Sequence, residues 1–170
     1  MTKVKAVKID GADIRIFNSA VYIFESSTGY TLELDIIVSE VAVNKYRNEE
    51  NLIVEFELED GRVFNSYMHV KSLSGGLPQL QLFCEIDDVR EYQGLPIVNE
   101  NDCSFPNIEE GITLEEIRKY EMPDEKITLK LKLPIVQTEW LRKQKGQQLE
   151  KIFTEAIYDY WKKHQIGSGQ

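Results

Sequence analysis

Apolar and polar residues alternate most regularly over residues 52–70, and this pattern predicts a β-hairpin. The apolar residues of both arms fall on even positions: Leu52, Val54, Phe56 and Leu58, then Phe64, Met68 and Val70. A two-residue Asp60-Gly61 turn would put the two apolar rows on opposite faces of the hairpin. A three-residue loop, Glu59–Gly61, with Gly61 left-handed and a G1 bulge keeps both rows on one face. We therefore predict the three-residue loop.

The N-terminal residues show the same period of two. Val4–Asp10 and Ala12–Phe17 predict a hairpin about Asp10-Gly11, and a two-residue turn there sets Val7 opposite Ile14.

Three further strands are expected at Val21–Glu25, Tyr30–Val43 and Leu80–Ile86, with a turn at Asn18-Ser19. Within the second of these strands the apolar residues move from even to odd positions after residue 36, which indicates a bulge or a bend. Residues 44–51 are polar and without periodicity, and they predict a loop.

The pattern fails over Asp87–Gly111, where glycine, proline and asparagine are scattered, so a long loop is expected there. Thr113–Met122 predicts a helix, because Thr113 and Glu116 have the spacing of a capping box. Ile127–Leu133 then alternates like a one-faced strand. The last element is an amphipathic helix whose apolar stripe comprises Leu149, Ile152, Phe153, Ala156, Ile157, Tyr160 and Trp161.

These elements predict an α+β fold: a mainly antiparallel β-sandwich or partly closed barrel of about eight strands, with a short helix and a C-terminal amphipathic helix. The chain has 170 residues, which predicts a single globular domain over residues 1–165 and a flexible tail over 166–170. A weak domain boundary near residues 71–78 is the alternative. The terminal helix either lies across the sheet and closes the core or docks into the groove of a partner.

Charge is distributed unevenly along the chain, whose net charge is −9. Residues 1–96 and residues 97–125 each carry −7, whereas residues 126–170 carry +5. The pI of about 4.8 argues against nucleic-acid binding, in spite of the basic C-terminal residues. No apolar run approaches the ~18 residues of a membrane helix, and no signal peptide is apparent. Two cysteines, Cys84 and Cys103, are too few for a disulfide framework, so a cytoplasmic location is expected.

Side chains of the kinds found in active sites are scarce. The sequence has no phosphate-binding loop, no GxSxG motif and no CxxC pair, and its two histidines, His69 and His164, suit neither a triad nor a zinc site. Glu85, Asp87, Asp88 and Glu91 form the densest carboxylate cluster, which is interpreted as a solvated turn. No catalytic residue, cofactor or metal site is assigned, and the protein is not expected to be an enzyme.

Concentrated charge without catalytic groups favours a non-catalytic protein-binding module, an inhibitor or adaptor that engages a basic protein through the acidic loop. The residues predicted to bind the partner are Glu100, Asp102, Glu109, Glu110, Tyr158 and Trp161. Two alternatives stay open. One is a small-molecule binder with a pocket lined by Phe56, Phe64 and Trp161. The other is a carboxylate- or metal-dependent hydrolase built on Asp87 and Asp88.

Overall fold

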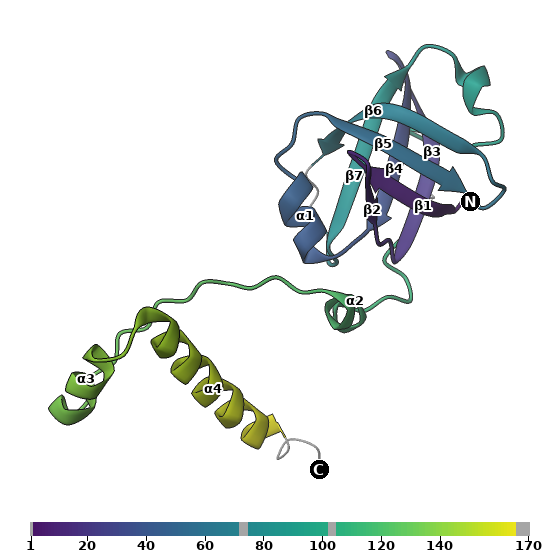
Figure 1. Cartoon of the computed structure of the whole chain (residues 1–170). Coiled ribbons are helices and arrows are strands. Elements are labelled where there is room, and N and C mark those ends of the chain that lie inside the picture. The colour runs from purple at the N-terminus through teal and green to yellow at the C-terminus, as the bar shows by residue number, and fades with distance from the viewer. Residues whose placement is uncertain (1, 72–74, 102–104, 166–170) are drawn as a thin grey trace. The chain divides into compact units, whose positions relative to one another are not determined.

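A computed structural model describes residues 2–71, 75–101 and 105–165 (Figure 1). It divides into two compact units, Met1–Glu125 and Lys126–Gln170, which we call the N-terminal unit and the C-terminal unit. Each unit is described by itself. The single domain over residues 1–165 stays a prediction, and the tail at 166–170 lies outside the described residues.

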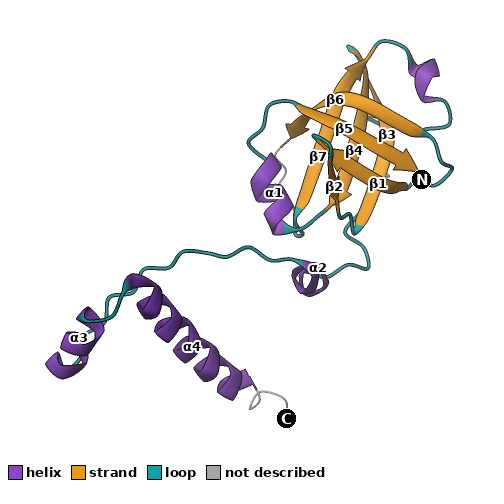
Figure 2. Ribbon diagram, viewed as in Figure 1, coloured by secondary structure: helices purple, strands orange, loops and turns teal. Residues whose placement is uncertain are grey.

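The N-terminal unit is built on one open sheet of eight strands with the order β2-β1-β5-β6-β7-β4-β3-β8 (Figure 2). The strands are β1 Val4–Ile9, β2 Ala12–Ile14, β3 Asn18–Ser26, β4 Gly29–Ile37, β5 Leu52–Leu58, β6 Val63–Lys71, β7 Gln79–Ile86 and β8 Ile97–Asn99. Neighbouring strands are antiparallel, except that β8 runs parallel to β3. The predicted α+β class with a mainly antiparallel sheet is confirmed.

The central hairpin has the predicted register. Phe56 of β5 pairs with Phe64 of β6, and the two rings stack with centroids 5.3 Å apart. The backbone N–H of Leu58 donates to the carbonyl of Arg62 at 2.8 Å, so the loop is Glu59–Gly61. Gly61 has a φ of 86°, the left-handed conformation that the three-residue loop requires.

The β1–β2 hairpin also has its predicted register, with Val7 opposite Ile14. Asp10 and Gly11 form its two-residue turn, both with positive φ. Strand β2 ends at Ile14 instead of continuing to residue 17, and the turn predicted at Asn18-Ser19 is wrong because both residues belong to β3. The Ser19 hydroxyl accepts a hydrogen bond from the backbone N–H of Val4 at 3.0 Å, an interaction between residues far apart in sequence that a local turn signal does not reveal.

The strand predicted over Tyr30–Val43 is too long. Strand β4 ends at Ile37, and helix α1 occupies Glu40–Tyr46, part of which was predicted to be a loop. The side chain of Ser39 caps this helix by accepting the Ala42 N–H at 3.1 Å. The change of apolar phase after residue 36 therefore marks a change from strand to helix.

Most of the core lies against one face of the sheet. Its largest fully buried side chains are Ile9, Ile23, Leu32, Leu34, Ile36, Leu52, Phe56, Leu58, Met68, Leu80 and Leu82. Strand β6 pairs with β5 through its first residues and with β7 through its last, so it connects the two parts of the sheet.

A second apolar cluster includes residues of the other face of β3 and β4, and helix α2, Leu114–Tyr120, contributes Ile117 to it. The predicted capping box of Thr113 and Glu116 is present, so this helix is confirmed.

Residues 87–111 are more structured than expected. They contain a 3₁₀ helix, η1 at Val89–Tyr92, and strand β8. In β8, Val98 pairs with Phe24 of β3. Parallel pairing between distant segments leaves no local sequence pattern over only three residues, so it could not be predicted.

The C-terminal unit contains helices α3, Ile135–Arg142, and α4, Gly146–Gln165. The strand predicted at Ile127–Leu133 is wrong, because residues 121–134 form neither helix nor strand. The apolar side chains of that segment are 39–69% exposed. A strand needs a neighbour for its backbone hydrogen bonds, and the described chain pairs none with this segment.

Candidate partner-binding surface

The residues predicted to bind a partner are divided between the two units. In the N-terminal unit Glu100 and Glu110 are exposed, whereas Asp102 lies outside the described residues. Glu109 is half-buried, and its carboxylate accepts the backbone N–H of Leu77 at 3.0 Å. Its side chain therefore holds the 75–77 loop, which leaves Glu100 and Glu110 as the exposed acidic candidates.

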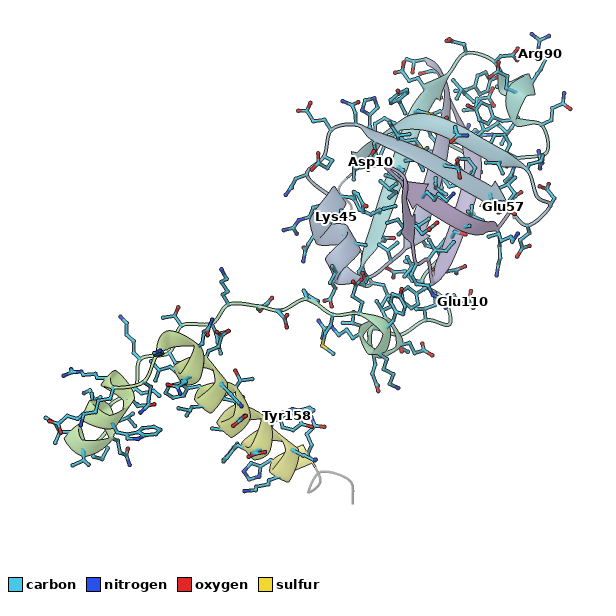
Figure 3. The ribbon with its side chains drawn as sticks, viewed as in Figure 1. Asp10, Lys45, Glu57, Arg90, Glu110 and Tyr158 are labelled. Carbon is cyan, nitrogen blue, oxygen red and sulfur yellow. The ribbon has the colours of Figure 1, made fainter. Side chains whose placement is uncertain are left out.

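Tyr158 and Trp161 both lie on α4 in the C-terminal unit, and Figure 3 shows the side chain of Tyr158 projecting from this helix. Their ring centroids are 6.1 Å apart, and each residue is 54% exposed. Aromatic residues of this size are usually buried or form anchors of an interface.

These two residues belong to a much larger exposed apolar surface. No described residue of the C-terminal unit is buried. The large apolar residues that it exposes are Ile127, Leu129, Leu131, Leu133, Ile135, Val136, Trp140, Phe153, Ile157, Tyr158, Tyr160 and Trp161. The terminal helix is predicted to close a core or to dock into a partner, and within the described C-terminal unit, taken by itself, none of its stripe residues is buried.

Most cations of the C-terminal unit form no ion pair within the described residues. This unit has nine Lys and Arg against four Asp and Glu. Lys151 forms an ion pair with Glu155 at 3.7 Å, and the other eight cations form none among the described residues. Positive charge thus accompanies the exposed apolar side chains.

The N-terminal unit has the opposite imbalance. It contains 11 Lys and Arg and 25 Asp and Glu, which gives a net charge of −14. Seven of its cations already form ion pairs with its own carboxylates, among them Lys5 with Glu57 and Arg118 with Glu40. Glu100 and Glu110 form no ion pair within the described residues, so their charge is available to a partner.

One cluster of ionisable residues escaped the sequence analysis. Glu33 is only 3% exposed, and its Oε1 accepts hydrogen bonds from Lys71 at 2.7 Å and from Thr31 at 3.2 Å. The Tyr22 hydroxyl donates to Asp35 Oδ2 at 3.1 Å. Glu33 Oε2 and Asp35 Oδ1 are buried without a hydrogen-bond partner.

Burial and the nearby Glu33 carboxylate raise the pKa of Asp35 to about 6, against the opposing hydrogen bond from Tyr22. Burial, together with the charges of Asp35 and Glu33, raises the pKa of Tyr22 as well. Glu33 and Asp35 alternate with apolar residues along β4, and this pattern does not by itself reveal that they are buried.

Two residues named in the alternative hypotheses, Asp88 and Phe56, have structural roles. The Asp88 carboxylate accepts hydrogen bonds from the backbone and side chain of Arg90, both at 2.9 Å, and these lower the pKa of Asp88. Phe56 is fully buried, so it offers no surface to a ligand. Both alternatives stay predictions.

No group of three His, Cys, Asp or Glu side chains in the described parts of the chain could hold a metal ion. Burial raises the pKa of the half-buried Cys84 thiol. Among the helices that the structure describes, none has both the length and the apolar character needed to cross a bilayer.

Comparison of the chain with protein-family models, with curated proteins and with solved structures finds no match.

Proposed function

We propose that the protein is a non-catalytic protein-binding module and that its C-terminal unit is the part that docks onto a partner protein. The observation that carries the proposal is the large exposed apolar surface of this unit, in which no described residue is buried. An isolated helix as short as α3 is marginally stable in water, and helices in proteins gain most of their stability by packing an apolar face, so α3 and α4 are expected to need a surface to pack against. Exposed apolar patches of this extent are typical of interaction sites.

The chemistry of the partner follows from the charge of the C-terminal unit. A surface that combines exposed aromatic rings with eight cations lacking ion pairs favours a partner surface with apolar pockets and an acidic rim. The last turn of α4 contributes Lys162 and Lys163 to this positive charge.

Affinity capture from the native cells tests the proposal. Full-length tagged protein is compared with Ile157→Asp/Trp161→Asp, in which two charges interrupt the apolar stripe of α4. A matched control, Gln147→Asp/Gln148→Asp, adds the same charge at exposed positions in the first turn of α4, more than two turns from Ile157 and Trp161. We expect quantitative mass spectrometry to find at least one protein that the wild type and the control retain and that the stripe variant loses by tenfold or more.

Equal capture by the stripe variant and the wild type would contradict the proposal. Thermal unfolding of all three proteins accompanies the capture, so that a loss of binding is not confused with a loss of the folded N-terminal unit.

A further inference from the structure

We propose that the partner of the C-terminal unit is the acidic N-terminal unit of a second copy of this chain, so that two copies exchange their C-terminal units. This inference rests on the proposed function and names the protein that its docking surface binds. It also explains together the acidic loop and the basic C-terminal residues, because the basic partner expected for the loop is then the C-terminal unit of another copy.

Charge complementarity is the first argument for a second copy. The N-terminal unit carries −14 and the C-terminal unit carries +5. Within the described residues, seven cations of the N-terminal unit are paired internally, whereas eight of the C-terminal unit are not. The unpaired cations of one unit therefore match the surplus carboxylates of the other, including Glu100 and Glu110. Opposite fields of this kind accelerate association and reject like-charged surfaces.

The segment that leads from α2 to α3 has the length for an exchange. Residues 121–134 form neither helix nor strand. An extended chain spans about 3.3 Å per residue, so these residues can reach about 45 Å. That distance exceeds the ~35 Å diameter expected for a compact unit of the size of Met1–Glu125, so a C-terminal unit can extend to a neighbouring molecule without any change in either fold.

The exposed area is sufficient for a stable dimer. Trp140, Tyr158, Tyr160 and Trp161 are each 52–68% exposed. A fully buried aromatic side chain removes roughly 150–250 Å² from water, so these four contribute about 400 Å². Each contact buries a similar area on the N-terminal unit that receives these side chains, which gives about 800 Å² for one contact. An exchange between two copies creates two such contacts. The total is about 1,600 Å², the size of a standard stable interface.

An exchange also gives a closed assembly. Each copy donates one basic unit and accepts one, so the two contacts are related by a two-fold axis and no docking surface is left over.

The experiment measures the mass of the full-length chain in solution and then exchanges charges between copies. Light scattering after size exclusion should give twice the 19.7 kDa mass of one chain at micromolar concentration. It should give the mass of one chain for Ile157→Asp/Trp161→Asp and the dimer mass for Gln147→Asp/Gln148→Asp. Raising the salt from 0.05 to 0.5 M should weaken the dimer at least tenfold.

Two charge-reversal variants then identify the surfaces. Glu100→Lys/Glu110→Lys weakens the acidic side, and Lys162→Glu/Lys163→Glu weakens the basic side, so each variant alone should dissociate at least tenfold more readily than the wild type. An equimolar mixture should form heterodimers at close to wild-type affinity, because both contacts in a mixed dimer again join opposite charges.

A monomeric wild type at 100 µM overturns the inference, and so does a dimer that survives the stripe substitutions or a mixture that fails to restore dimers. If the wild type is monomeric but the stripe variant still loses a captured protein, the proposed function stands with an unrelated partner. If neither a dimer nor a stripe-dependent captured protein is found, both proposals are wrong.

Discussion

At the scale of single residues, the most unusual feature is the pair of buried carboxylates on β4. Glu33 is compensated by Lys71, whose ammonium lies 2.7 Å from its Oε1, and Asp35 has the Tyr22 hydroxyl at 3.1 Å. One oxygen of each carboxylate stays without a partner. Buried polar atoms of this kind reduce stability, so this cluster is the place where the fold of the N-terminal unit depends most on pH.

Stability should fall as pH rises through the titration of Asp35. Its pKa is about 6 in the folded protein and 3.8 in the unfolded chain, so the folded state holds the proton more tightly. The contribution of Asp35 to the free energy of unfolding is fully present below pH 4 and is lost as pH rises through 6. The loss amounts to about 2–3 kcal/mol. Urea unfolding between pH 4 and pH 7.5 measures it, and Asp35→Asn should remove most of the dependence. The exposed-site variant Asp124→Asn should keep it.

Tyr22→Phe should destabilise the protein by about 1–3 kcal/mol at pH 7.5, because the Asp35 carboxylate loses its phenol donor in a buried position. The same substitution should cost less at pH 4.5, where Asp35 is protonated. Chemical denaturation at the two pH values measures the difference, and an equal cost at both would show that the hydroxyl does not interact with the charged form of Asp35.

At the scale of elements, the hairpins were predictable and helix α1 was not. In the β5–β6 hairpin, an odd-numbered loop, most simply one of three residues, brings both apolar rows to one face, so the sequence alone favoured the observed register. Helix α1 contains β-branched residues directly after a strand, and its local pattern resembles the continuation of that strand. The decisive interactions are the capping by Ser39 and the tertiary contact of its hydroxyl with Glu121 Oε2 at 2.5 Å.

Ser39→Ala should therefore destabilise the N-terminal unit by about 1–2 kcal/mol, because α1 loses its cap and Glu121 loses its donor. Equilibrium unfolding of the variant checks this value. Ser39→Asp serves as the matched control, since it keeps an N-cap acceptor but places a second carboxylate beside Glu121. An unchanged stability for Ser39→Ala would mean that packing alone holds the helix.

The loop glycine of the central hairpin gives a second element-scale prediction. Gly61→Ala forces a side chain into the left-handed conformation, and no heavy atom within 4 Å would clash with the new Cβ. The cost should thus be purely conformational, about 1–2 kcal/mol. Thermal unfolding measures it, and Gly146→Ala, at the helical first residue of α4, should not share this destabilisation.

At the scale of the whole molecule, the two units differ in how they obtain stability. The N-terminal unit has two apolar clusters of its own, whereas no described residue of the C-terminal unit is buried. Folding of the first unit therefore needs nothing from the second, and the second needs a surface that the proposed exchange would supply.

Hydrogen exchange on the full chain should show this difference directly. Amides of β4 should exchange only when the whole unit unfolds, because this strand has a paired strand on each side in the sheet. Amides of α4 should exchange at least 100-fold faster than those of β4 in the monomeric Ile157→Asp/Trp161→Asp variant, since an unpacked helix opens readily. In the wild type, dimer formation should slow amide exchange in α4 at least tenfold relative to the monomeric variant. Equal protection of α4 in both proteins would contradict a packing role for its stripe.

The sequence by itself determined the α+β class, the registers of two hairpins, the capped helix α2 and the opposite charges of the two ends of the chain. Each of these depends on interactions between near neighbours or on composition alone. Only the tertiary structure decided that Ile127–Leu133 is not a strand, that Glu33 is buried and that Glu109 holds a loop. The physical reason is that a strand needs a neighbouring strand for its backbone hydrogen bonds, and that the burial of a charged side chain depends on the residues packed around it. In both cases these neighbours come from distant parts of the sequence.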